Sequence, residues 1–248
     1  MLLSESESEN NFNLTHQLEK STLAINTSAI LATNLSKHVG EGANKIEILN
    51  GLNLEVAQGE SVAIVGSSGS GKSTLLALLA GLDVPTTGAV EVANAPFSAL
   101  DEDARAALRG AQMGFVFQSF QLLPTMTALE NVMLPMQLAN RKDAMQMAVA
   151  TLEKVGLAER LQHYPKQLSG GEQQRVAIAR AFAPQPSILF ADEPTGNLDI
   201  ATGERIIDLL FSLNMQANTT LILVTHDAQL AQRCKRTLIL QHGQLSPV

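Results

Sequence analysis

A glycine-rich stretch that ends in lysine and serine carries the clearest chemistry of this 248-residue chain. Residues 66–73 read Gly-Ser-Ser-Gly-Ser-Gly-Lys-Ser. The glycines allow backbone angles that side chains forbid, so several N–H groups can converge on one phosphate. Lys72 adds a mobile charge for the β- and γ-phosphates, and the Ser73 hydroxyl is placed to coordinate Mg²⁺. The alternative is a plain serine–glycine turn. The cofactor-binding residues predicted here are Gly66, Ser67, Ser68, Gly69, Ser70, Gly71, Lys72, Ser73 and Thr74.

A second chemical group stands where an apolar run ends in two carboxylates. Residues 187–193 read Ser-Ile-Leu-Phe-Ala-Asp-Glu, which is typical of a buried strand. Because successive side chains of a strand point to opposite faces, Asp192 and Glu193 should have different roles. We expect Asp192 to hold Mg²⁺ through water and Glu193 to polarise an attacking water as general base. The alternative is a solvated acidic strand end.

A third group, at residues 169–172, reads Ser-Gly-Gly-Glu. Serine followed three residues later by glutamate predicts a capping box at the start of a helix. The two glycines leave N–H groups uncovered, and the positive end of the helix dipole favours an anion. Since the chain's own phosphate loop needs no second cradle, we infer that Ser169, Gly170 and Gly171 serve the γ-phosphate held by another copy.

Strands and helices must position these groups, and the hydrophobic pattern predicts both. Their alternation implies a mainly parallel sheet within one α/β domain at residues 28–248. From about residue 120 to residue 183 the strand pattern stops, which predicts an inserted helical subdomain. The expected strands are residues 30–35, 46–56, 60–65, 90–92, 113–117, 188–190, 220–224 and 237–240, and the expected helices are residues 72–81, 127–138, 142–155, 171–182 and 201–213.

Composition excludes several classes of protein. The chain is 45% hydrophobic, and its single cysteine, Cys234, rules out an internal disulfide framework. The net charge of −7 argues against duplex nucleic acid as the main partner, because binding phosphates needs clustered basic residues. No apolar run reaches the roughly 18–20 residues of a membrane-spanning helix. Residues 1–27 are predicted to be a disordered polar extension.

In their order and spacing, these motifs resemble those of the ATP-binding cassette (ABC) transporter ATPases. The resemblance covers about residues 28–245 and includes Gln118 after a strand, Asn197-Leu198-Asp199 and His226. The stretches at residues 114–118 and 191–199 are similar to the lipoprotein-release and macrolide-exporter group (LolD and MacB). The resemblance implies a phosphate-loop NTPase core, an antiparallel β subdomain and an inserted α-helical subdomain.

The resemblance also implies roles for individual residues. Gln118 would contact Mg²⁺ and sense the γ-phosphate, and Asp199 would lie at a dimer seam. His226 would contact the γ-phosphate and orient the water with Glu193; taken alone, it could be an ordinary surface histidine. One position departs from the pattern: Val39 stands where an aromatic side chain usually stacks on adenine.

The function that the resemblance implies is ATP hydrolysis, with Lys72, Gln118, Glu193 and His226 as the catalytic residues and with Ser73, Gln118 and Asp192 at Mg²⁺. The expected partners are a second copy, joined by two ATP molecules, and an integral-membrane ABC permease, with no nucleic acid. The chain would lie on the cytoplasmic face of a bacterial inner membrane and drive export, lipid or lipoprotein extraction, or force transmission. The alternatives are a soluble ABC ATPase acting on DNA or ribosomes and a non-hydrolysing regulatory nucleotide binder.

Overall fold

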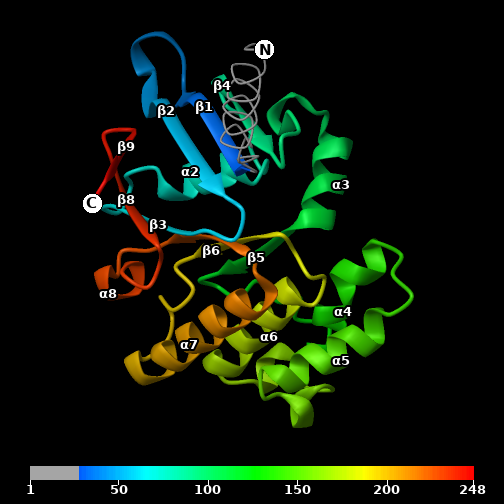
Figure 1. The fold of residues 1–248 in the computed structure, drawn as a ribbon. Helices are drawn as coiled ribbons and strands as arrows, with labels where there is room; N and C mark the ends of the chain where they lie inside the picture. The colour runs from blue at the N-terminus through cyan, green and yellow to red at the C-terminus, as the bar shows by residue number, and fades with distance from the viewer. Residues whose placement is uncertain (1–27) are drawn as a thin grey trace, which may run out of the picture.

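The computed structural model describes residues 28–248, so the predicted extension at 1–27 lies outside the described residues. Two sheets form the frame (Figure 1). The smaller sheet is antiparallel, with β1 between β2 and β4. The larger has the order β5-β6-β7-β3-β8-β9 and is parallel except for β9, which runs antiparallel to β8. The strands are β1 Ser28–Val39, β2 Ile46–Ala57, β3 Ser61–Val65, β4 Thr87–Val92, β5 Met113–Phe117, β6 Ile188–Asp192, β7 Thr220–Val224, β8 Arg236–Gln241 and β9 Gln244–Pro247.

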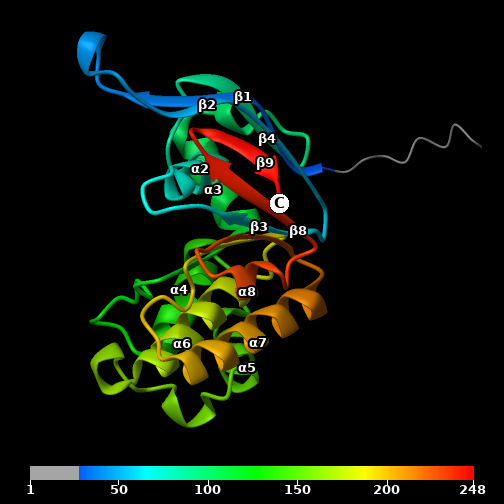
Figure 2. The same cartoon turned by 90° about the vertical axis from the view of Figure 1, so that its left-hand side faces the viewer.

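Helices cover both faces of the six-stranded sheet. Figures 1 and 2 show α2 between the two sheets, with α4 to α7 gathered on the opposite face. Between residues 120 and 183 the structure has helices and no strand, as the pattern predicts. The helices are α2 Lys72–Leu79, α3 Glu102–Gln112, α4 Ala128–Leu138, α5 Ala144–Lys154, α6 Gly170–Phe182, α7 Ile200–Ala217 and α8 Ala228–Ala231, with 3-10 turns at Gly42–Asn44, Phe97–Ala99, Ala158–Arg160 and Pro165–Gln167.

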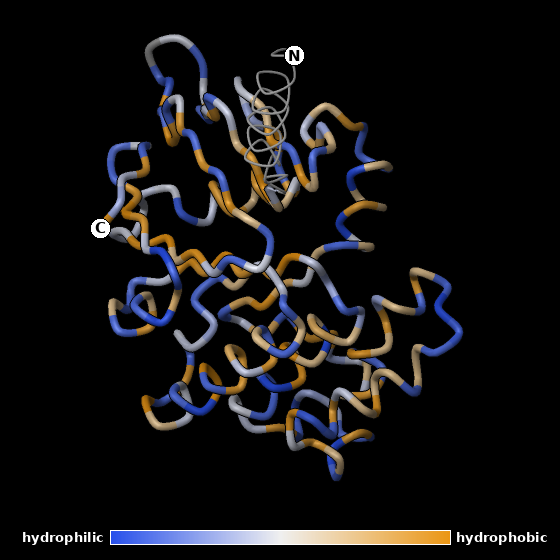
Figure 3. Tube along the Cα trace, in the orientation of Figure 1, coloured by the Kyte–Doolittle hydropathy of each residue, from blue (hydrophilic) through white to orange (hydrophobic). Residues whose placement is uncertain are grey.

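The core divides into two clusters because neighbouring side chains of each central strand face opposite ways. Ile188 and Phe190 of β6 pack toward α2 and the antiparallel sheet, whereas Leu189 and Ala191 pack toward α6 and α7. In Figure 3 the hydrophobic colour follows the central strands. The same alternation turns the next residue, Asp192, toward the α2 side, where the phosphate loop lies.

The predicted fold class is confirmed, with differences at a few elements. The helix expected at residues 72–81 ends at Leu79, and Gly81 follows with a φ of 63° that a helix cannot continue. No element was expected at α3, which has no fully buried residue; its half-buried face includes Leu108, which packs against the core, beside Arg105 and Arg109. Helix α8 and strand β9, of four residues each, were also missed. Among residues 28–248, no helix has the length and apolar character needed to cross a bilayer.

Candidate functional site

The phosphate loop connects β3 to α2, as the sequence predicts. Gly71, just before α2, has a φ of 99°, a left-handed angle that favours glycine. A Cβ there would lie 3.0 Å from Ile48 Cγ2 of β2, so the loop also passes too close to the antiparallel sheet for a larger residue. The loop is therefore fixed from both sides, with its backbone turned around the start of α2.

Lys72 is buried, and its ammonium group is held at the loop. Lys72 Nζ donates to the carbonyl oxygens of Gly66 and Ser67, at 2.9 Å each. An ammonium group has three N–H donors, so one remains available for a phosphate oxygen. The loop thus orients its positive charge through its own backbone.

Two of the three predicted magnesium ligands, Ser73 and Asp192, lie within hydrogen-bond distance of each other at the edge of the sheet. Ser73 Oγ on α2 donates to Asp192 Oδ2 at the end of β6, at 3.2 Å. Burial raises the pKa of Asp192 above its ordinary value, and the Ser73 hydrogen bond opposes that shift. A hydroxyl and a carboxylate oxygen are hard ligands that suit Mg²⁺. The residues present therefore fit this cation.

Glu193 and His226 form the pair that the sequence predicts. His226 Nδ1 lies 2.8 Å from Glu193 Oε1, and the histidine side chain is 73% exposed while that of the glutamate is 18% exposed. Thr225 Oγ1 donates to Glu193 Oε2 at 3.3 Å. The carboxylate is thus held from both oxygens, beside an accessible imidazole.

One pocket joins most of the predicted residues. The phosphate loop lines it together with Gln118, Asp192, Glu193 and His226. Gln118 Nε2 also donates to Asn197 Oδ1 at 3.2 Å, which links the end of β5 to the segment after Glu193. The phosphate loop, three candidate metal ligands (Ser73, Gln118 and Asp192) and the candidate base Glu193 therefore face one space.

Several predicted residues lie elsewhere. Ser70 belongs to the loop but lines a neighbouring hollow with Ile46 and His242. Val39 ends β1, is 46% exposed and pairs with Ile46 of β2; the residue of β2 that lines the main pocket is Ile48. These positions leave the role of Val39 at adenine a prediction.

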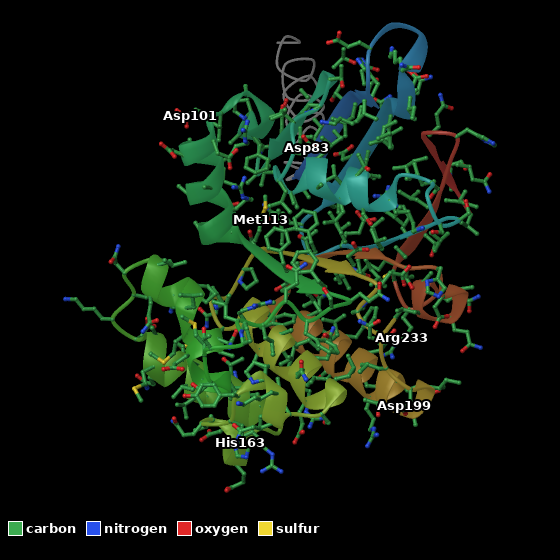
Figure 4. All side chains as sticks on the ribbon, turned by 180° about the vertical axis from the view of Figure 1, so that it is seen from behind. Asp83, Asp101, Met113, His163, Asp199 and Arg233 are labelled. Carbon is green, nitrogen blue, oxygen red and sulfur yellow. The ribbon has the colours of Figure 1, made fainter. Side chains whose placement is uncertain are left out.

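The serine–glycine group also lies outside this pocket. Ser169 caps α6 with the predicted capping box, because Ser169 Oγ accepts from Glu172 N while the Glu172 carboxylate accepts from Ser169 N. Gly170 and Gly171 open the helix, and neither lines the pocket of the phosphate loop. Asp199 caps α7 and lines an adjoining surface hollow, which shares Glu193 and His226 with the pocket of the phosphate loop and which Arg233 also lines; Figure 4 labels Asp199 and Arg233.

Sequence reasoning missed two residues that support the site. Thr225 is almost fully buried and bonds Glu193; a polar residue directly after the apolar strand β7 was the available signal. Ile48 lines the pocket from β2, and no signal in the sequence marks it, because it follows the ordinary alternation of a strand.

Comparisons with known proteins agree with this geometry. Residues 49–196 match the model of the family described as ABC transporter. The chain is 58% identical over 214 residues to the uncharacterized ABC transporter ATP-binding protein YbbA of Escherichia coli (strain K12), covering 86% of this chain and 94% of that protein. It is 49% identical over 223 residues to the lipoprotein-releasing system ATP-binding protein LolD of Legionella pneumophila (strain Paris), covering 89% and 98%.

A solved structure of similar fold has a TM-score of 0.80 and 41% sequence identity, covering 88% of this chain and 98% of its own. It is the dimeric post-hydrolysis state of the ATP-binding cassette MJ0796 bound to ADP and phosphate. The resemblance drawn from the sequence motifs is therefore confirmed.

Proposed function

This chain belongs to the ABC transporter family of ATP-hydrolysing cassettes, and from this premise we propose that two copies close around two ATP molecules and drive a membrane-embedded ABC permease. The observation that carries the proposal is the division of the site. The phosphate loop and the residues predicted as metal ligands and base share one pocket, whereas the capped start of α6 lies outside it. A second copy brings its own α6 to the open side.

The residues of the pocket divide the chemistry among them. Lys72 and the N–H groups of the loop bind the β- and γ-phosphates. Ser73, Asp192 and Gln118 would hold Mg²⁺, which would neutralise developing charge on the phosphates. Glu193 takes a proton from the attacking water as general base. His226, bonded to the same carboxylate, orients that water against the γ-phosphate.

Two-fold symmetry completes both sites in one step. In a head-to-tail pair, Ser169, Gly170 and Gly171 of each copy face the nucleotide of the other, and Asp199 lies at the seam between them. ATP is then a shared ligand that favours the closed pair, and its hydrolysis lets the pair open. The similar MJ0796 cassette is described as a dimer with ADP and phosphate bound, which supports this arrangement.

The motion would pass to a permease through the helices between residues 120 and 183. Such a complex places the chain on the cytoplasmic face of the inner membrane. The 49% identity to a lipoprotein-releasing ATP-binding protein supports export or extraction of lipid-linked cargo, or force transmission. Purification of the tagged chain from detergent-solubilised membranes should recover an integral-membrane subunit; recovery of ribosomes or DNA instead would contradict the proposal.

The dimer is tested by replacing the base. The Glu193→Gln variant is expected to bind ATP, to lose at least about a hundredfold in kcat, consistent with the usual contribution of a general base, and to accumulate as a closed dimer with Mg-ATP. Light scattering with and without Mg-ATP measures the mass. A variant that hydrolyses ATP at the parental rate would remove Glu193 from the role of base, and one that stays monomeric would overturn the shared site.

A further inference from the structure

A fully buried glutamine ties helix α6 to the backbone that follows Glu193. Gln174 has no exposed surface, and its Nε2 donates to the carbonyl oxygen of Pro194 at 2.7 Å. Its Oε1 accepts no hydrogen bond from any residue that the structure describes. Burying an amide whose oxygen stays unpartnered is unfavourable, so the position calls for an explanation that packing does not supply.

The backbone at Glu193 is in a conformation that glutamate rarely adopts. Its φ is 46°, in the left-handed region, and the next residue is proline, which restricts the preceding residue to extended angles. Two backbone hydrogen bonds hold it, from Glu193 N to Val224 O at 2.9 Å and from Gly196 N to Glu193 O at 3.0 Å. The bond from Gln174 to Pro194 is the contribution of α6 to keeping this turn.

Close packing fixes the same segment against the start of α6. A Cβ on Gly171 would lie 2.6 Å from Thr202 Cγ2, and one on Gly170 would lie 3.3 Å from Leu198. On the other side, a Cβ on Gly196 would lie 2.6 Å from Gln118 Nε2. The residues after Glu193 are thus held between α6 and Gln118 with no room to shift independently.

We propose that Gln174 is a positioning residue, which sets the direction of the Glu193 carboxylate through the Pro194 carbonyl and so couples α6 to the chain's own base. The inference rests on the proposed function, in which the start of α6 faces the nucleotide of the other copy. When that nucleotide docks against the start of α6, the bond from Gln174 to Pro194 adjusts the direction of the Glu193 carboxylate in the same chain. Nucleotide binding at one site thus changes the position of the base at the other site through the side chain of Gln174.

The test replaces the donor while keeping its size. Gln174→Met is similar in length and cannot donate, and we expect kcat to fall about tenfold with KM for ATP changed less than twofold, which is the size of effect that one net hydrogen bond supports. The matched control is Gln173→Met on the same helix, because Gln173 Nε2 donates only to Leu168 O beside it. We expect that control to keep kcat within twofold. Parental kcat in Gln174→Met would overturn the inference.

A second measurement separates positioning from a structural role of Gln174. In the Glu193→Gln background the base is already removed, so adding Gln174→Met should leave the ATP concentration for half-maximal dimerisation within twofold. A large loss of dimer there would mean that Gln174 supports the shape of α6, and the inference would fail. If Glu193→Gln alone forms no dimer, the proposed function fails instead, which keeps the two outcomes distinct.

A second variant covers the case in which Gln174→Met does not fold. Glutamate at this position has the same shape, and its carboxyl donates to Pro194 O only while protonated; burial favours that protonated form. Relative to the parent, kcat of Gln174→Glu should be near unity at pH 6 and fall at least fivefold by pH 9. A ratio that does not change with pH would contradict the proposed bond.

Discussion

Val39 is the residue whose environment departs most from its expected role. It is 46% exposed at the end of β1, and it pairs with Ile46 of β2, which is 64% exposed and lines a hollow with Ser70 of the phosphate loop. An aliphatic side chain therefore stands where a ring was expected. Stacking of a base on an aromatic ring is worth about 1–3 kcal/mol. Aliphatic contacts cover a base without that contribution, which predicts weak affinity for the adenine moiety.

The Val39→Tyr variant should therefore bind ATP more tightly. We expect the dissociation constant to fall about tenfold, within the range that stacking supports, while the dissociation constant of inorganic tripolyphosphate stays unchanged. Titration calorimetry measures both ligands, and Val39→Leu is the control for added bulk. Unchanged ATP affinity in Val39→Tyr would place the base away from the end of β1.

Residue types and spacing predict the residues expected to contact phosphate and metal better than the residues that position those side chains. Lys72, Ser73, Asp192 and Glu193 were each predicted, and the structure brings them into one pocket with His226. Thr225 and Gln174 act through hydrogen bonds to the Glu193 segment from distant parts of the chain. The polar Thr225 directly after an apolar strand could have been noticed, but the partners of Thr225 and Gln174 could not be predicted, because they depend on how β7 and α6 pack against β6.

At the scale of elements, the start of α6 depends on an ionised side chain. Hydrogen bonds from the backbone N–H of Ser169, the Ser169 hydroxyl and Arg160 together lower the pKa of Glu172 to about 2. Since the folded pKa lies below the ordinary value of 4.5, the carboxylate stabilises the fold above about pH 4.5. That contribution is lost as the pH falls from about 4.5 through 2.

The Glu172→Gln variant isolates this titration, because glutamine keeps the capping shape without a charge. Near pH 6 the parent should be more stable to urea by about 0.5 kcal/mol, the usual contribution of a negative side chain at a helix N-terminus. The difference in free energy of unfolding should shrink as the pH is lowered from 5 toward 3. An equal difference at every pH would mean that the charge of Glu172 does not stabilise the start of α6.

Long elements that bury a broad apolar face were predicted, whereas α3, with no fully buried residue, and the four-residue elements α8 and β9 were missed. The strands β3, β6 and β7 are continuous apolar runs, and α6 and α7 carry buried residues at helical spacing. Helix α3 has Asp101 at its cap and no fully buried residue, and arginines share its half-buried face with Leu108, so it contains no run of apolar residues that the hydrophobic pattern would mark. The hydrophobic pattern indicates which residues are buried, so it predicts an element only where that element buries apolar residues.

At the scale of the whole molecule, the chain separates the two halves of its chemistry. The phosphate loop, between β3 and α2, lines one pocket, and the start of α6 lies outside that pocket. Under the proposed function, a single copy binds a nucleotide on one surface and offers a capped helix start on another. The sequence predicts different roles for Ser169 and Glu193, and the structure adds that the start of α6 does not line the pocket of Glu193.

The Ser169→Arg variant tests that separation in the whole molecule. A bulky cation at the start of α6 should block the seam between copies. Turnover is therefore expected to fall below about a hundredth of the parent, which is the usual loss when one group that stabilises the charge of the transition state is removed. ATP binding to the monomer should stay within twofold of the parent. The control is Asp101→Arg. The exposed Asp101 side chain caps α3 by accepting from Ala104 N, and the variant that removes this cap should retain turnover. Equilibrium binding of a fluorescent ATP analogue and phosphate release measure the two properties. Because a cap contributes only about 1 kcal/mol, loss of a cap alone cannot produce that difference. If Ser169→Arg abolishes ATP binding to the monomer, the serine belongs to the site of its own chain, and the division between two copies is wrong.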